Sequence, residues 1–263
     1  VSPNFFDNSS GRAVILSSDG KVGLMVNEED HLRIQALSSG LCLFETWHCA
    51  DKIDESLSVN LEYAFGEHLG YLASCPTNVG TGLRASVMFH LPGLVLTNQT
   101  QGVVKTLITQ NFAVRGLFGE GTRATGNLYQ ISNQATLGKS EEEIIESLSK
   151  GCERIIRSEL AAREQLMKEM KNEIIDRVYR AKGILAHAHM LNFEEAVELL
   201  SVIWLGAEIK ILPGLETLNI GETLFSVGSG HLQAQSGKTL SEERIELERA
   251  KTIKRKFEIY GGF

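Results

Sequence analysis

This sequence contains few cysteines and no long apolar run, and these two features argue against a disulfide-rich protein and against a membrane-spanning one. Its four cysteines, Cys42, Cys49, Cys75 and Cys152, are too few and too scattered for a disulfide framework, so we expect a reducing, cytoplasmic environment. No apolar stretch approaches the roughly 18–20 residues that a membrane-spanning helix requires. The first residues also lack the basic start and apolar core of a secretory signal, so we expect no membrane partner.

A surplus of positive charge is missing too. The chain has 26 Lys and Arg against 33 Asp and Glu, which gives a formal net charge of -7 at pH 7. General nucleic-acid binding needs a basic surface to neutralise phosphates, so we expect no nucleic-acid partner. Any anionic ligand must then be held by a few well-placed arginines.

Several familiar site signatures are also absent. Gly237-Lys238-Thr239 resembles the end of a P-loop, but the glycine required five residues earlier is Leu232. No Gly-x-Gly-x-x-Gly opens a helix after a strand, and no Gly-x-Ser-x-Gly elbow occurs. Without a Cys-x-x-Cys or His-Glu-x-x-His, we expect no metal site, and we interpret the remaining candidate ligands as core or half-buried side chains: Cys42, His48, Cys49, His187 and His189.

The hydrophobic pattern predicts strands mainly in the first half of the chain. We expect a hairpin of strands 13–16 and 22–26, followed by a third strand over 31–37 in which apolar and polar residues alternate. A helix over 44–59 comes next, and then a short strand over 71–75. Residues 83–108 are expected to be helical with an interruption at Pro92-Gly93, and 112–117 and 127–133 to be strands.

Helical spacing dominates the second half. Residues 140–180 are the longest helical pattern, and Ser140 followed by Glu143 is the signature of a capping box at its start. Further helices are expected over 193–204 and 240–257. Because strand signals fade beyond Gly183, we place a domain boundary near residue 182.

A first polar cluster, Asn27 to Arg33, brings three carboxylates to the entry of the third strand. Side chains repeat every second residue in a strand, so Glu29, His31 and Arg33 should share one face, with Glu29 and Arg33 about 13 Å apart at ~3.3 Å per residue. One end would then hold a cation and the other an anion. The alternative is an ordinary solvated surface.

Two further clusters combine arginine with glycine loops. Cys75 to Arg84 has the pattern of a strand, a glycine loop and a helix start, whose backbone N–H groups would attract phosphate beside Arg84. Arg115 to Thr122 again sets an arginine at a strand end before a loop of glycines. Each loop taken alone could be a tight turn. The recurrence of arginine beside such loops, without a basic surplus, favours a phosphate clamp.

In this order, the three clusters strongly resemble those of the phosphagen kinases, the ATP:guanidino phosphotransferases. The resemblance implies that Glu28 and Glu29 hold a guanidinium, that Cys75 is a reactive cysteine near it, and that Mg²⁺ accompanies ATP. Because a guanidinium must lose a proton as it is phosphorylated, Glu29 is our first choice as the proton acceptor, with Glu28 as its partner. The arginines implied for the ATP phosphates are Arg33, Arg84 and Arg115. The nucleotide-binding segments implied are Arg84, Ala85, Ser86, Val87 and Met88, and Arg115, Gly116, Leu117, Phe118, Gly119 and Glu120.

Within that family the chain looks like the bacterial protein-arginine kinases. Met88 and Gln130 stand where creatine and arginine kinases carry a histidine and an aspartate. The branch implies an α+β fold, a mostly antiparallel sheet flanked by helices, with residues 1–182 as the catalytic domain and 183–263 as a helical tail domain. It also implies protein substrates bearing arginine, a homodimer through the tail, and links to stress-response regulators, protein quality control and the proteolytic machinery.

Two departures from the family pattern bear on activity. The family's amino-terminal domain, with its Ser-x-Arg-x-Arg segment, has no counterpart here. An Arg-Asp-x-x-Arg-Ala segment binds phosphoarginine in the tail of the branch, and the matching positions here are Ile245, Glu246, Arg249 and Ala250, of which only the last two agree. We therefore expect that allosteric pocket to be weak or lost. A binding module that recognises arginine or phosphoarginine proteins without catalysis, and a small-molecule guanidino kinase, remain as alternatives.

Overall fold

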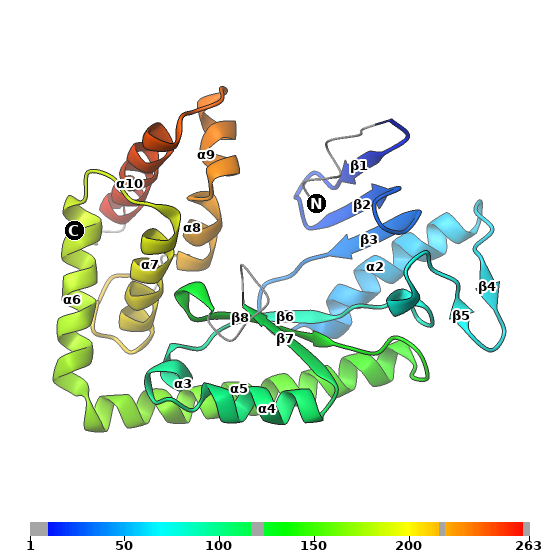
Figure 1. Ribbon diagram of the computed structural model, residues 1–263, viewed down its shortest axis with the longest axis horizontal. Coiled ribbons are helices and arrows are strands. Elements are labelled where there is room, and N and C mark those ends of the chain that lie inside the picture. Colours follow the sequence, from blue (N-terminus) through cyan, green and yellow to red (C-terminus); the bar gives the residue numbers. More distant parts are fainter. Residues whose placement is uncertain (1–9, 117–123, 216–218, 260–263) are drawn as a thin grey trace. The chain divides into compact units, whose positions relative to one another are not determined.

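The computed structural model describes residues 10–116, 124–215 and 219–259. An antiparallel meander opens this part of the chain and consists of β1 (Ala13–Leu16), β2 (Val22–Val26) and β3 (Leu32–Ala36) (Figure 1). The carboxylate of Asp19 orders the β1–β2 turn, since it accepts from the Ser17 hydroxyl at 2.7 Å and from the Lys21 N–H at 3.1 Å. The predicted hairpin and third strand are confirmed.

The next segment is a helix followed by very short strands. Helix α2 (Leu43–Ser58) agrees with the predicted helix. Strands β4 (Phe65–Gly66) and β5 (Gly70–Tyr71), each two residues long, pair antiparallel as a small hairpin. The one-turn 3-10 helix η1 (Pro76–Asn78) follows. The predicted strand over 71–75 is therefore wrong beyond Tyr71, because the backbone after it turns into η1 and makes no sheet ladder.

A second three-stranded sheet has the order β6-β8-β7, formed by β6 (Ser86–His90), β7 (Phe112–Gly116) and β8 (Leu128–Asn133). The hydrogen bonds from Asn133 N–H to Ala85 O and from Leu91 N–H to Asn127 O show that β6 and β8 are antiparallel. The 3-10 turn η2 (Thr125–Asn127) precedes β8. The predicted strands near 112–117 and 127–133 are confirmed.

The helix predicted over 83–108 is wrong in its first part. Residues 86–90 form strand β6, and only α3 (Pro92–Leu96) and α4 (Thr100–Thr109) are helical. Ser86-Val87-Met88-Phe89-His90 has the β-branched and aromatic content of a strand, and pairing with β8 satisfies its backbone. Pro92 begins a helix here, as proline does at a first helical position.

Two long helices follow instead of the one predicted. Helix α5 (Glu141–Glu169) ends at Glu169, because the next residue, Met170, has a non-helical φ of -129°, and α6 (Lys171–His187) begins after it. The capping box at the start of α5 is confirmed: the Glu143 N–H donates to Ser140 Oγ at 3.2 Å and the Ser140 N–H donates to the Glu143 carboxylate at 2.9 Å.

The remaining elements are helices: α7 (Phe193–Glu208), α8 (Ile220–Ser226), α9 (Ser229–Ser236) and α10 (Glu242–Ile259). The predicted helices near 193–204 and 240–257 are confirmed, whereas the short α8 and α9 were missed. Helices α6, α7 and α10 pack side by side around one apolar core (Figure 1). Gly206 of α7 permits the close approach to α6, because a Cβ there would lie 2.6 Å from a methyl of Val178.

The chain forms two compact units. The first comprises the described residues up to Val87 with Thr106–Val114 and Ile131–Arg154, and the second the described residues of Met88–Lys105, Arg115–Gln130 and Ile155–Phe263. The boundary expected near residue 182 lies inside α6 and stays a prediction. Within the described residues, no helix has both the length and the apolar character to span a membrane.

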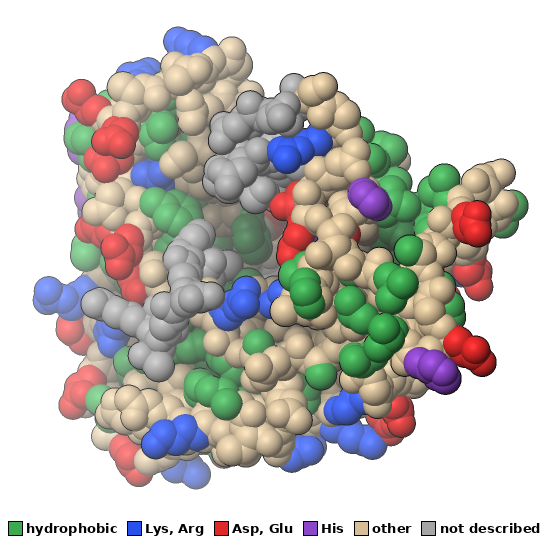
Figure 2. All heavy atoms as spheres, turned by 45° about the vertical axis from the view of Figure 1, so that its right-hand side comes forward, with side chains coloured by type: hydrophobic (Ala, Val, Ile, Leu, Met, Phe, Trp, Pro, Cys, Tyr) green, Lys and Arg blue, Asp and Glu red, His purple; other side chains and the backbone are tan. Residues whose placement is uncertain are grey.

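The first unit leaves many hydrophobic side chains at its surface, and Figure 2 shows such side chains gathered on the right of the view. Strand β1 exposes Ile15 by 58% and Leu16 by 67%, and the β4–β5 hairpin exposes Phe65 by 61%. The second unit contains an extensive apolar core, with Leu200, Ile203 and Phe257 fully enclosed, although it too exposes single apolar side chains such as Phe225.

Candidate functional site

The predicted carboxylates lie on a turn, and Arg33 folds back onto them. Asn27 adopts a left-handed φ of 56°, and its N–H donates to His31 O at 2.9 Å, so residues 27–31 form the turn between β2 and β3. Arg33 Nη1 lies 2.6 Å from Glu28 Oε2, and Arg33 Nη2 lies 3.2 Å from Glu29 Oε2. The expectation that Glu29 and Arg33 are held far apart on one strand face is therefore wrong, because the strand begins only at Leu32.

This turn grips a guanidinium with two carboxylates. Two N–H groups of one guanidinium each donate to a different glutamate, an arrangement that matches the planar fork of arginine. The Glu28 side chain is 11% exposed and the Glu29 side chain 45%. Glu28 is thus fixed in the wall of the turn, and Glu29 is open to solvent.

The Cys75 loop does not contain the expected α-helix start. Cys75 is half-buried and precedes only the three-residue η1, and its Sγ lies 3.0 Å from Thr77 Oγ1. Arg84 is exposed and stands two residues before strand β6. The macrodipole argument for phosphate binding at Arg84 is therefore wrong, and only the charge of the guanidinium remains.

Two side chains outside the predicted set hold this loop. The Asp30 carboxylate accepts from Ser74 N–H at 2.6 Å, from Cys75 N–H at 3.3 Å and from Asn78 Nδ2 at 2.7 Å. Thr136 lies across the loop, where its hydroxyl is 2.7 Å from Val79 O and its carbonyl accepts from Thr81 N–H at 2.9 Å. Asp30 belongs to the first polar cluster but was given no role, and Thr136 was not predicted at all, because the partners of both are distant in sequence.

Gly80 explains why the loop needs glycine beside Thr136. Its φ is +113°, a value that residues other than glycine rarely adopt, and a Cβ there would overlap the Thr136 carbonyl. The glycine therefore lets two backbone segments meet directly.

The implied nucleotide-binding residues are divided between the two units. Ala85 is buried and donates its N–H to Asn133 Oδ1 at 2.8 Å, Ser86 is exposed, and Val87 is half-buried. In the second unit, Met88 is 40% exposed, Arg115 is exposed near the end of β7, and Gly116 is buried. The rest of the implied loop lies outside the described residues: Leu117, Phe118, Gly119 and Glu120.

The interpretation of the candidate metal ligands as core or half-buried side chains is confirmed only for Cys42, which is half-buried. It is wrong for four others, because outward-facing positions of α2 and around the end of α6 leave them exposed: His48, Cys49, His187 and His189. Cys42 Sγ lies 3.2 Å from Ser39 O, and the His48 ring stacks on Trp47 at 4.8 Å between centroids. In the described part of the chain, no group of three or more His, Cys, Asp or Glu side chains is placed to hold a metal ion.

The tail residues matched to the phosphoarginine segment are built into the core. Arg249 is 2% exposed, and its guanidinium donates to Val227 O at 2.9 Å, to Leu191 O at 2.7 Å and to Ser229 Oγ at 3.3 Å. Burial lowers the pKa of Arg249, while the charge of Glu246 opposes that shift. Ile245 and Ala250 are also buried. Arg249 therefore ties α10 to the segments before α7 and around α9, with its donors facing protein oxygens.

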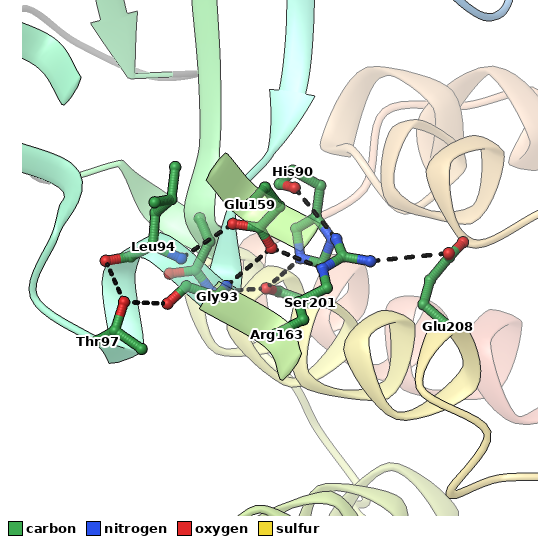
Figure 3. A network of polar contacts seen from close by, with 9 residues as sticks. His90, Gly93, Leu94, Thr97, Glu159, Arg163, Ser201 and Glu208 are labelled. Atoms are coloured by element: carbon green, nitrogen blue, oxygen red, sulfur yellow. Dashed lines mark hydrogen bonds and ion pairs between the residues drawn. The ribbon is translucent and has the colours of Figure 1, made fainter. Parts of the chain in front are cut away.

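A buried polar network in the second unit was also unforeseen (Figure 3). The Glu159 carboxylate accepts from Gly93 N–H at 2.8 Å and Leu94 N–H at 2.9 Å at the start of α3, and is paired with Arg163 Nε at 2.6 Å. His90 Nε2 lies 2.8 Å from Ser201 Oγ, and its ring stacks on Trp204. Burial, with a smaller contribution from Arg163, lowers the pKa of His90 to about 3, so this histidine is neutral at physiological pH.

Comparison with known families agrees with these features. Residues 1–162 match the family described as ATP:guanido phosphotransferase, C-terminal catalytic domain. Residues 171–261 match the family described as Protein-arginine kinase McsB C-terminal domain. Together the two matches span nearly the whole chain.

Individual relatives carry the name protein-arginine kinase. The chain is 46% identical over 259 residues to that of Clostridium kluyveri, covering 98% of this chain and 75% of the relative. It is 46% identical over 257 residues to that of Pelotomaculum thermopropionicum, covering 98% and 72%. It is 47% identical over 254 residues to that of Symbiobacterium thermophilum, covering 97% and 72%.

Solved structures support the fold. The duplicated taurocyamine kinase from Schistosoma mansoni, with bound transition state analog components, matches 72% of this chain and 29% of its own, with a TM-score of 0.54 and 22% identity. Its substrate-free form matches 67% of this chain and 27% of its own, with a TM-score of 0.50 and 23% identity. The match therefore spans less than a third of the taurocyamine kinase chain. The predicted α+β fold is confirmed, and by the extent and identity of the sequence matches the chain belongs to the protein-arginine kinase family of ATP:guanido phosphotransferases.

Proposed function

We propose that this chain transfers the γ-phosphoryl group of ATP to the guanidinium of arginine side chains in proteins, with Glu28 and Glu29 as the groups that hold the guanidinium. Family membership supports the reaction. The observation that carries the residue assignment is that Glu28 and Glu29 already grip one guanidinium, that of Arg33, at 2.6 and 3.2 Å.

The proton balance assigns different tasks to the two glutamates. A guanidinium nitrogen attacks the γ-phosphorus, the bond from that phosphorus to the bridging oxygen breaks, and ADP leaves with the electron pair. The attacking nitrogen must give up a proton, because a protonated guanidinium has no lone pair to donate. Glu29, the more exposed carboxylate, accepts that proton, and the less exposed Glu28 orients the fork.

Arg33 occupies the carboxylates in the structure and must leave them for a substrate to enter. The resemblance to phosphagen kinases assigns Arg33 to the phosphates of ATP. A polyphosphate offers its guanidinium more negative charge than the two glutamates do, so ATP would draw Arg33 away and vacate Glu28 and Glu29. On this view the arginine side chain keeps the empty carboxylates neutralised until the nucleotide is bound.

The remaining assignments follow the same chemistry. Arg84 and Arg115 would complete the phosphate clamp, and Cys75 would lie beside the guanidinium. Phosphoryl transfer passes through a loose, in-line transition state, so positioning and charge neutralisation supply most of the acceleration. No described cluster of carboxylates or imidazoles is built to hold a cation by itself, so Mg²⁺ would be carried on the ATP phosphates.

The wider biology is proposed from family membership alone. We infer a catalytic domain over residues 1–182, a helical tail over 183–263, a homodimer through that tail, and a cytoplasmic location. Links to stress-response regulators, protein quality control and the proteolytic machinery are proposed on the same ground. Sedimentation of the chain against a variant altered on the exposed face of α6 would test the dimer.

Replacing Glu29 by glutamine tests the proposal. Glu29→Gln keeps the shape of the side chain but removes the charge that pairs with the guanidinium and accepts its proton, so phosphotransfer should be lost while nucleotide binding is retained. Radiolabel transfer from ATP to a protein substrate is measured in a protein that also carries the amino-terminal domain expected from the family. Glu62→Gln, at an exposed position of the same unit, is the matched control. Transfer by Glu29→Gln above about one-twentieth of the unmutated rate would refute the assignment.

A further inference from the structure

Beyond the residues assigned above, we propose that Asp30 is a positioning residue that fixes the Cys75 loop against the Glu28–Glu29 turn. This inference rests on the proposed function of that turn. Asp30 directly follows Glu29, so the two Cα atoms are only ~3.8 Å apart along the chain. The same side chain reaches residues 44 to 48 positions later, within the same unit.

The contacts of Asp30 use both carboxylate oxygens. Oδ1 accepts from the backbone N–H of Ser74 at 2.6 Å and of Cys75 at 3.3 Å, and Oδ2 accepts from Asn78 Nδ2 at 2.7 Å. The three donors belong to the start and the end of one short turn around η1. A single carboxylate therefore sets the conformation of that turn and its place beside the acidic residues.

The Asp30 carboxylate accepts backbone N–H groups as a helix-capping side chain does, but its partners lie far from it in the sequence. An aspartate that only ordered its own turn would bond to neighbours in sequence, as Asp19 does with Ser17 and Lys21. Asp30 instead joins the two segments that carry Glu29 and Cys75. Small displacements of a reacting group are costly in rate, so a carboxylate that fixes both segments bears directly on the chemistry.

Exchanging the two polar partners gives a sharp test. Asn78→Asp alone would face Asp30 with a second carboxylate, and the repulsion should push the loop away. Adding Asp30→Asn in the same chain restores the pairing. The amide oxygen introduced at position 30 accepts from the Ser74 and Cys75 N–H groups, and the amide nitrogen donates to the carboxylate introduced at position 78. Asp30→Ala removes every acceptor and should not be rescued by Asn78→Asp.

The first measurement is hydrogen exchange of the Ser74 and Cys75 amides, which needs neither ATP nor a protein substrate. We expect exchange to be at least about fivefold faster in Asp30→Ala and in Asn78→Asp, and to return to the original rate in the exchanged pair. Asp19→Ala is the control, since it removes a turn-forming aspartate of the same unit without touching the loop.

The second measurement is phosphotransfer in the protein supplied with the family's amino-terminal domain. We expect kcat to fall at least about tenfold in Asn78→Asp with KM for ATP unchanged, and to recover in the exchanged pair, because the proposed function assigns Cys75 to the guanidinium and not to the phosphates. Unchanged amide exchange in Asp30→Ala, or an exchanged pair that recovers neither exchange nor kcat, overturns the inference. Failure of the proposed function would show separately, as phosphotransfer retained by Glu29→Gln with the amide-exchange pattern intact.

Discussion

Replacing Arg249 by methionine should destabilise the helical tail, because this guanidinium is a structural cross-link. Its three donors satisfy Leu191 O, Val227 O and Ser229 Oγ, and its carbon lies 5.5 Å above the Phe193 ring. Methionine fills similar space but donates nothing, so two buried carbonyl groups lose their partners. Each such loss costs about 1–3 kcal/mol.

One opposing effect reduces that sum. Burial lowers the pKa of Arg249, which shows that enclosing its charge is itself unfavourable, and methionine removes this cost. We therefore expect a net loss of about 2–4 kcal/mol in the free energy of unfolding, with the hydrogen bonds outweighing the desolvation. At roughly 2–4 °C per kcal/mol for chains near this size, Tm should fall by at least about 4 °C.

Arg244→Met is the matched control on the same helix. Arg244 is 55% exposed and pairs with Glu248 at 3.2 Å across one helical turn, an interaction worth about 0.3–0.5 kcal/mol at a solvated surface. Thermal unfolding of the two variants is compared by circular dichroism. If Arg249→Met unfolds at the same temperature as Arg244→Met, the cross-link interpretation is refuted.

The same geometry predicts how the tail responds to phosphoarginine. The phosphoryl group of phosphoarginine needs hydrogen-bond donors, but the Arg249 guanidinium already donates to backbone carbonyl oxygens of the protein. The side chains at the matching positions Ile245 and Glu246 supply no donor. Free phosphoarginine should therefore bind the tail weakly and cause no activation. In calorimetric titration, micromolar binding that disappears in Arg249→Ala would show that this prediction is wrong.

Two further predictions concern titrating side chains. Iodoacetamide should modify Cys75 first, since the Thr77 hydroxyl 3.0 Å away can donate to its sulfur, and mass spectrometry detects the order of labelling. Cys152 should react last, since burial raises the pKa of that thiol to about 12. Labelling of Cys42, Cys49 or Cys152 before Cys75 would contradict this. His90 has a pKa of about 3 in the folded protein and an ordinary value of 6.5 in the unfolded chain. Between pH 6.5 and pH 3 only the unfolded chain protonates this histidine, so the free energy of unfolding falls as the pH drops through that range. The stability difference between the unmutated protein and His90→Gln should shrink by up to about 1.4 kcal/mol per pH unit from 6.5 towards 3, and a difference independent of pH would exclude this role for His90.

Local patterns in the sequence were sufficient for several elements. The β1–β2 hairpin depends on a turn whose residues bond to one another, and the start of α5 depends on Ser140 and Glu143, three residues apart. Such interactions involve near neighbours, so they are visible without the fold. The order of the three polar clusters likewise indicated the family before any geometry was known.

Tertiary structure decided what distant partners control. Strand β6 has a pattern that also suits a helix, and it becomes a strand because β8 satisfies its backbone. Arg33 meets Glu28 and Glu29 because the chain reverses at Asn27, and Asp30 reaches a loop more than forty residues away. The sequence identified Arg249 only as a remaining position of a phosphoarginine segment, and the fold buries it against the carbonyl groups of Leu191 and Val227. In each case the residue type allowed several interaction partners, and burial and hydrogen bonding in the folded chain determined which partner was used.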